Sequence, residues 1–246
     1  MSLLELSAIT KSFGAIHALQ GVDLSVEPGE AIGLMGDNGA GKSTLVKIIA
    51  GNFPPTSGDV KVEGRKVHFI RPLDARDAGI EVVYQDLALA DNLTASENVF
   101  LGREIQTGWG PFRTLDKPAM IQRSAELFEE LKSETRPRDV VRKMSGGQRQ
   151  AVAIARTRLS DPKLVLMDEP TAAISVRQVA EVLNLIHRLK ATNHAVLLIS
   201  HRMPDVFEVC DRVAVLRRGK KVADKRTSDT TPEEITGLIT GAIDAA

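Results

Sequence analysis

The sequence is poor in cysteine and in aromatic residues. Among its 246 residues there are one cysteine, one tryptophan and one tyrosine, and Phe, Trp and Tyr together make up 4%. A single cysteine, Cys210, excludes an intramolecular disulfide framework and indicates a reducing compartment. We expect Cys210 to be a small buried hydrophobic residue.

An excess of either charge is also missing. Lys plus Arg and Asp plus Glu number 32 each, so the formal net charge is zero. A protein that lives on the phosphate backbone of a nucleic acid usually carries a basic excess. The balance therefore argues against a nucleic-acid partner.

Long apolar runs are absent from the sequence as well. No run approaches the roughly 18–20 residues that a membrane-spanning helix needs. The start, MSLLELSAIT, has neither the basic nor the apolar region of a signal peptide. We expect a cytoplasmic chain that reaches a membrane only through a partner.

What the sequence does contain is an alternation of buried strands and helices, which is typical of an α/β fold with a mostly parallel sheet. Residues 3–26 alternate short apolar runs with turns and predict antiparallel strands. From about 87 to 159 the pattern turns helical, with a loop at 103–116. We predict one domain over 1–246, in which 1–86 and 160–246 form the sheet-bearing core and 87–159 a helical subdomain. A last helix is predicted after Thr231, with Pro232 first and a capping box to Glu234.

The stretch GDNGAGKST matches the phosphate-binding pattern G-x-x-x-x-G-K-[ST] and lies between a predicted strand and a predicted helix. Glycines let the backbone curl around an anion, and the N–H groups at the helix start bind phosphate oxygens. Lys42 is expected to reach the β- and γ-phosphates, and the Ser43 hydroxyl to bind Mg²⁺. The alternative is a glycine-rich turn without a ligand. The expected nucleotide-binding residues here are Gly36, Asn38, Gly39, Ala40, Gly41, Lys42, Ser43 and Thr44.

Two adjacent acids end the apolar run LVLM. The run delivers Asp168 to the carboxyl edge of the sheet, where open α/β sheets bind ligands. We expect Asp168 to be associated with Mg²⁺ and Glu169 to polarise the attacking water. His201 follows another buried strand, so it reaches the same edge and could hydrogen-bond the γ-phosphate. The alternatives are an acid that caps the following helix and a structural histidine.

A second glycine motif lies in the helical region, where Ser145, Gly146 and Gly147 open the helix of QRQAVAIARTRL. Such a helix start is another anion cradle, because its N–H groups are free and the helix dipole is positive there.

Together, the phosphate loop, Gln85 after a strand, MSGGQ, LVLMDEP and ISH, in this order, resemble the nucleotide-binding subunit of an ABC transporter over essentially the whole chain. The resemblance implies that two copies pair head to tail. Each ATP, with Mg²⁺, would lie between the phosphate loop of one copy and Ser145, Gly146, Gly147 and Gln148 of the other.

The resemblance also implies roles for single residues. Phe13 would stack on adenine, although the residue type alone favours a core position. Gln85 would touch Mg²⁺ or the attacking water, Glu169 would be the general base and His201 the γ-phosphate switch. Met144 stands where the family usually has Leu, a volume-conserving exchange that we expect to be tolerated.

Two longer stretches, 84–104 and 200–224, resemble the ATPases of bacterial carbohydrate importers of the ribose, xylose and fructose type. This implies integral membrane permease subunits as partners, a sugar-binding protein acting indirectly, and a place on the inner face of the cell membrane. Many such relatives carry two ATPase domains in one chain. Because this chain has one such domain, the resemblance implies a homodimer. We also expect no room in the chain for the regulatory domain that maltose-type ATPases carry.

Two alternatives stay open at this stage. One is a non-transport ABC ATPase associated with translation or chromosomes. The other is a regulatory module that binds ATP with weak turnover. Ser175 bears on the second alternative, since it replaces the Asp that the family usually has at the dimer interface. A serine can still cap the helix that follows, but it carries no charge.

Overall fold

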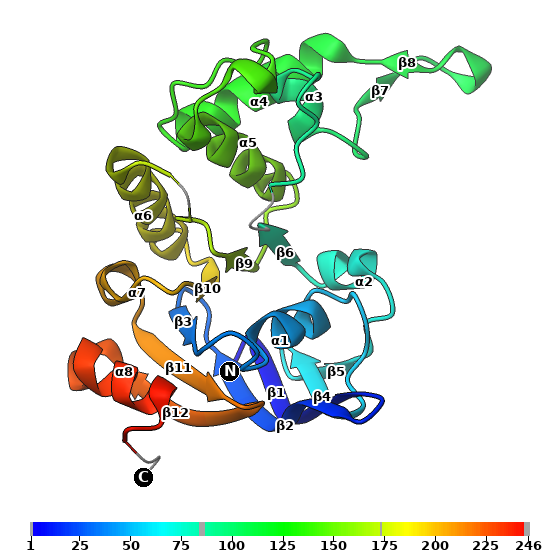
Figure 1. Ribbon diagram of the computed structural model, residues 1–246. Coiled ribbons are helices and arrows are strands. Elements are labelled where there is room, and N and C mark those ends of the chain that lie inside the picture. The colour runs from blue at the N-terminus through cyan, green and yellow to red at the C-terminus, as the bar shows by residue number, and fades with distance from the viewer. Residues whose placement is uncertain (1, 84–86, 173, 244–246) are drawn as a thin grey trace. The chain divides into compact units, whose positions relative to one another are not determined.

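The computed structural model describes residues 2–83, 87–172 and 174–243, and it divides into two compact units. The core unit comprises Met1–Val82, Pro162–Pro170 and Leu183–Ala246, and the helical unit comprises Val83–Asp161 and Thr171–Val182 (Figure 1). The helical unit thus contains 171–182, whereas the predicted helical subdomain covered 87–159 alone.

A six-stranded sheet in the order β12-β11-β3-β10-β9-β6 forms the centre of the core unit. The pairs β3–β10, β10–β9 and β11–β3 are parallel, whereas β12 pairs antiparallel with β11. Strands β3 and β10 are buried along their whole length, which explains their continuous apolar runs. The prediction of a mostly parallel sheet is confirmed. The strands are β3 (Ala31–Met35), β6 (Ile80–Val83), β9 (Leu164–Asp168), β10 (Ala195–Ile199), β11 (Arg212–Arg217) and β12 (Lys220–Arg226).

The predicted antiparallel strands form a second sheet of the core unit, in the order β2-β1-β4-β5. Its buried residues Leu4, Leu6 and Ile9 join Leu45 and Ile49 of helix α1 in one apolar cluster. The cluster fixes α1 (Lys42–Ile49), and with it the loop that precedes it. The strands are β1 (Leu4–Phe13), β2 (Ile16–Val26), β4 (Ser57–Val62) and β5 (Arg65–Val67).

Three further helices of the core unit are α2 (Pro72–Asp77), α7 (Met203–Val209) and α8 (Pro232–Thr240). The short α2 was not predicted, because its sequence PLDARD has no apolar period. Thr231 caps α8 through its side chain, but the predicted capping box is only half formed. The carboxylate of Glu234 instead binds Lys225 and accepts a hydrogen bond from Thr230 Oγ1 (2.6 Å).

Cys210 is buried, as predicted, and burial raises the pKa of its thiol to about 12. At pH 8 the thiolate fraction in the folded protein is then about one in ten thousand. We expect iodoacetamide to leave Cys210 unmodified in the native protein and to alkylate it in urea, as read by mass spectrometry. Equal rates in the two states would contradict the buried placement.

The helical unit packs α3 (Ala95–Val99), α4 (Lys117–Glu130) and α5 (Gly146–Arg158) around an apolar cluster that includes Phe100, Leu127 and Phe128. Met144 belongs to this cluster. A hairpin of β7 (Gln106–Thr107) and β8 (Thr114–Leu115), joined through the 3₁₀ turn Gly110–Phe112, lies in the predicted loop and extends away from the helices (Figure 1). Two more 3₁₀ turns are at Val141–Lys143 in this unit and Thr227–Asp229 in the core unit.

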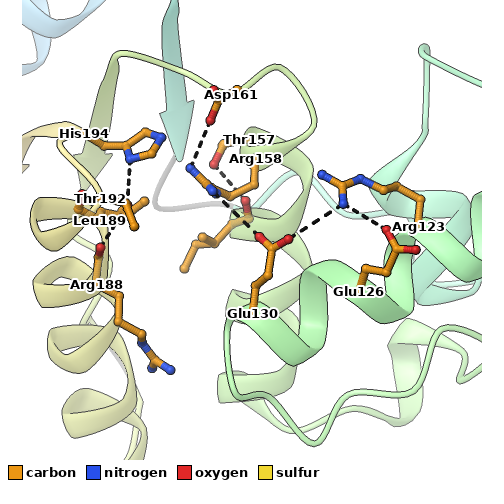
Figure 2. A network of polar contacts seen from close by, with 11 residues as sticks. Arg123, Glu126, Glu130, Thr157, Arg158, Asp161, Arg188, Leu189, Thr192 and His194 are labelled. Carbon is orange, nitrogen blue, oxygen red and sulfur yellow. Dashed lines mark hydrogen bonds and ion pairs between the residues drawn. The ribbon is translucent and has the colours of Figure 1, made fainter.

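Ion pairs connect α4 and α5 within the helical unit (Figure 2). Glu130 lies between Arg123 (3.7 Å) and Arg158 (3.7 Å), and these arginines also reach Glu126 (3.0 Å) and Asp161 (3.4 Å). Since most of these side chains are solvent-exposed, each pair stabilises the fold by at most about 1 kcal/mol.

The long helix α6 (Val176–Ala191) begins in the helical unit and ends in the core unit. Its end is closed by Thr192, whose hydroxyl donates to the carbonyl oxygens of Arg188 (3.0 Å) and Leu189 (3.1 Å) and contacts Nδ1 of His194 (2.8 Å) (Figure 2). Among the described residues, no helix is long and apolar enough to cross a membrane.

Candidate functional site

The loop between β3 and α1 is closed by its own lysine. The ammonium of Lys42 donates to the carbonyl oxygens of Gly36 and Asp37 (2.9 Å to Asp37), and the residue is 7% exposed. Asp37, Asn38 and Gly39 are exposed, so the loop presents backbone to solvent next to the start of α1. A helix start carries unpaired N–H groups and a positive partial charge, which together suit a phosphate.

Glycine is required at two positions of this loop for different neighbours. A Cβ at Gly36 would lie 2.2 Å from the carbonyl oxygen of Leu216, and one at Gly41 would lie 2.7 Å from that of Ala18. Both residues have positive φ, 148° and 104°. At Gly39, where φ is 80°, a Cβ would meet no atom of the described residues within 4 Å. The glycine spacing thus reflects close backbone approach at two positions and conformation alone at the third.

The two acids stand where β9 ends. Asp168 is opposite Ile199 of β10, and the N–H of Glu169 donates to the carbonyl oxygen of Ile199 (2.9 Å). Because β9 and β10 are parallel, the residues that follow them meet at one edge, and His201 Nε2 lies 3.1 Å from Glu169 Oε1. Glu169 has a left-handed backbone with φ 51°, an uncommon conformation that concentrates at functional sites.

Electrostatics connects these acids with the loop. Burial lowers the pKa of Lys42, and the carboxylates of Glu169, Asp37 and Asp168 oppose that shift. Burial raises the pKa of Asp168 against the opposing charge of Lys42, and it raises the pKa of Glu169 against the opposing effect of His201. The core unit therefore gathers Lys42, Asp168, Glu169 and His201 into one partly desolvated cluster.

One oxygen of this cluster has spare accepting capacity. Oε1 of Glu169 is buried, and among the described residues it accepts no well-aligned hydrogen bond, while Nε2 of His201 lies 3.1 Å from it. A buried acceptor of this kind can take a proton from a water molecule held next to it.

The residues present also fit Mg²⁺. Within the described parts of the chain, no three His, Cys, Asp or Glu side chains gather into a metal-holding group. Mg²⁺ does not need such a group, because it binds through one or two protein oxygens, phosphate oxygens and water. The Ser43 hydroxyl and the Asp168 carboxylate are donors of that kind.

Phe13, at the end of β1, is not a core residue, since it is 48% exposed. Its ring packs edge-on against that of Phe53 (centroids 5.5 Å apart), and the ammonium of Lys11 lies over both rings. Lys11 is itself fixed by donating to the carbonyl oxygen of Pro54 (2.7 Å). Phe53 and Lys11 were not among the residues predicted for this site, because only the fold brings residue 53 next to residue 13 and thereby places both rings beside Lys11.

The second glycine motif lies in the helical unit, at the start of α5. Ser145 Oγ accepts from the N–H of Gln148 (3.3 Å), and Gln148 Oε1 accepts from the N–H of Ser145 (3.0 Å), which makes a complete capping box. Gly146 and Gly147 form the first turn between them.

The motif and the phosphate loop belong to different units. Gln85 lies outside the described residues.

Ser175 caps α6, as predicted. Its Oγ accepts from the N–H of Gln178 (3.4 Å), while Gln178 Oε1 accepts from the N–H (2.9 Å) and the hydroxyl (3.0 Å) of Ser175. The sequence contains the matching spacing Ser-x-x-Gln, which would have predicted this box as well.

Replacing Ser175 by Ala is expected to lower the free energy of unfolding by about 1 kcal/mol, because the cap acceptor is lost. Ser175→Asp keeps a capping oxygen and should unfold within a few tenths of a kcal/mol of the parent. Urea unfolding followed by circular dichroism measures both. Equal stability of all three proteins would show that the cap contributes nothing.

Comparison with known proteins agrees with this arrangement of motifs. Residues 19–172 match the family described as ABC transporter. The chain is 46% identical to a xylose/arabinose import ATP-binding protein of Sulfolobus acidocaldarius, covering 97% of this chain and 94% of that protein. It is 40% identical to a fructose import ATP-binding protein of Rhizobium meliloti (98% and 94%) and 41% identical to a ribose import ATP-binding protein of Burkholderia pseudomallei (97% and 46%). It thus spans about half the length of the ribose relative.

Solved structures show the same fold. A nucleotide-free ATP-binding cassette from an ABC transporter superposes with a TM-score of 0.83 at 30% identity, covering 98% of this chain and 96% of that one. A dimeric cassette in a post-hydrolysis state, bound to ADP and phosphate, gives 0.76 at 27% identity, with 91% and 98% covered. The chain belongs to the ABC transporter family. It is an ATP-binding cassette and an ATPase.

Proposed function

We propose that the chain is the ATP-hydrolysing subunit of an importer that takes up a monosaccharide through separate membrane permease subunits. The cluster of Lys42, Asp168, Glu169 and His201 in the core unit supports the motor role. The sugar class is supported by the xylose/arabinose, fructose and ribose import relatives, at 40–46% identity over nearly the whole chain.

In this proposal the phosphate loop binds the nucleotide in the core unit. The ammonium of Lys42 and the loop and helix N–H groups from Gly36 to Thr44 hold the phosphates, and Phe13 stacks on adenine. Ser43 and Asp168, with Gln85, would hold Mg²⁺. The metal supplies neutralisation of charge on the phosphate oxygens when bound.

Hydrolysis then depends on two side chains. Oε1 of Glu169, which is buried beside His201, accepts a proton from the attacking water. His201, 3.1 Å from that oxygen and half exposed, can orient the same water or hydrogen-bond the γ-phosphate. Because the pKa of Glu169 is raised, it lies closer to the working pH, and general-base catalysis is most efficient when these two values are close.

A second copy completes the site in the proposed head-to-tail dimer, by supplying Ser145, Gly146, Gly147 and Gln148. ATP then favours the closed dimer, because contacts to both copies exist only in that state. Closure of the dimer would drive the conformational change of the permease, and product release would reopen the dimer. In this role the two units act as one ABC domain, on the inner face of the membrane, and a separate binding protein selects the sugar.

Co-purification followed by reconstitution tests the function. We expect the chain to co-purify with a permease, and ATP hydrolysis in vesicles to rise when the sugar-loaded binding protein is added. Co-purification with ribosomes or chromosomal DNA would instead support a non-transport ATPase. Turnover with the permease no higher than that of Glu169→Gln would support a regulatory module.

A further inference from the structure

The glycine turn at the start of α5 is shaped by a neighbouring helix. A Cβ at Gly147 would lie 2.9 Å from Cγ of Gln178 and 2.9 Å from Oε2 of Glu181, both on α6. A Cβ at Gly146 would lie 3.3 Å from Cγ2 of Ile174 and 3.4 Å from Nε2 of Gln178. All of these residues belong to the helical unit. The glycines therefore let α6 pack directly on the backbone of the turn.

Gln178 both hydrogen-bonds to Ser175 and packs beside Gly147 at this contact. Its Oε1 is fixed by the N–H and hydroxyl of Ser175, and its methylene stem occupies the space beside Gly147. Fixing the amide end removes rotamer freedom from the stem, so the stem keeps one position against the turn. Two Ser-x-x-Gln boxes, at 145–148 and 175–178, thus meet through one side chain.

Within the turn, Gly146 and Gly147 have no side chains, and the capping box of Ser145 and Gln148 fixes only the two ends. Because the glycine backbone is permissive, the groups that pack beside these two residues also limit where their N–H groups lie. If Gln178 is shortened, a gap opens beside Gly147 and the turn gains room to shift. We therefore expect weaker anion binding at the Ser145–Gly147 turn and unchanged binding at the phosphate loop in the core unit.

We propose that Gln178, fixed by Ser175, is a positioning residue that holds the Ser145–Gly147 turn in place for a phosphate bound to a second copy of this chain. The inference rests on the proposed function, because it takes the turn to act across an ATP-bound dimer. It also gives Ser175, which lacks the charge usual at its position, a role through hydrogen bonding within its own subunit.

The test uses the full chain with Glu169→Gln as the parent, in order to suppress turnover. Sedimentation at increasing ATP with Mg²⁺ gives the ATP concentration for half-maximal dimer formation. ADP binding to the monomer reports the phosphate loop alone. Gln178→Ala should raise the half-maximal ATP concentration about three- to ten-fold, the usual range for one lost hydrogen bond with its packing. The Kd for ADP should stay within about two-fold of the parent value.

Two further variants separate the cap from the packing. Gln178→Glu keeps both the stem and the acceptor and should restore parental dimer formation to within about two-fold. Gln178→Leu keeps a stem of similar bulk without the acceptor and should behave like Gln178→Ala. Asn184→Ala, at an exposed position of the same helix, is the matched control and should match the parent.

The outcomes that contradict the inference are distinct from those that contradict the proposed function. If the parent dimerises and Gln178→Ala does so at the same ATP concentration, the inference is wrong even where thermal stability has fallen. Parental behaviour of Gln178→Leu also overturns it, because packing bulk alone would then suffice. If the parent stays monomeric with ATP and Mg²⁺, the proposed function fails and this inference falls with it.

Discussion

Glu169→Gln is expected to lower steady-state ATP hydrolysis by about 10²- to 10⁴-fold, the range typical for loss of a general base. The amide is isosteric with the carboxylate but cannot accept the proton of the attacking water. The chain should still fold, because Gln suits the left-handed backbone at φ 51° no worse than Glu and the N–H bond to Ile199 stays. With hydrolysis suppressed and ATP binding intact, an ATP-bound dimer should accumulate.

Phosphate release measures the rate, and light scattering on a sizing column measures the dimer. Glu129→Gln, the same exchange at an exposed position of α4, is the control and should retain parental activity. If the Glu169→Gln protein kept more than about a tenth of parental turnover, Glu169 would not be the general base. A protein that loses ATP binding would show that the carboxylate matters for binding and not only for chemistry.

Gly36→Ala is expected to lower the free energy of unfolding by about 2–4 kcal/mol and to abolish nucleotide binding. The new methyl group would lie 2.2 Å from the carbonyl oxygen of Leu216, a buried residue of β11, so either the strand or the loop must move. The loop carries the carbonyl oxygens that hold Lys42, and a displaced loop misplaces the lysine as well.

Gly39→Ala separates this clash from the intrinsic strain of a positive φ. Gly39 has φ 80°, but a Cβ there would meet nothing within 4 Å in the part of the chain that the structure describes, so we expect the conformational cost alone, about 1–2 kcal/mol. Urea unfolding of both variants and of the parent gives the two differences. A Gly36→Ala protein no less stable than Gly39→Ala would contradict the close approach of Leu216.

The sequence predicted those parts of the site that depend on short segments and on the direction of strands. The phosphate loop is contiguous, and the meeting of Glu169 with His201 follows from β9 and β10 being parallel, since Glu169 directly follows β9 and His201 is the second residue after β10. Whether Gln85 takes part remains a prediction, because it lies outside the described residues.

Contacts between segments distant in the chain could not be predicted in this way. Phe53 against Phe13 and Gln178 against Gly147 each join residues more than 30 positions apart, and no local pattern encodes such a pairing. The α8 capping box failed for a related reason. Glu234 has the right spacing from Thr231, but Lys225 and Thr230 compete for its carboxylate, and a charged partner is the stronger one.

The antiparallel strand β12 has a consequence for the behaviour of the protein at high concentration. The central strands are almost wholly apolar, and an open sheet of that composition invites edge-to-edge aggregation. At one edge β12, with the sequence KKVADKR, places five charged residues in seven positions. A charged edge discourages unwanted strand pairing. The charges along β12 thus protect this edge of the sheet from backbone pairing with another copy of the chain.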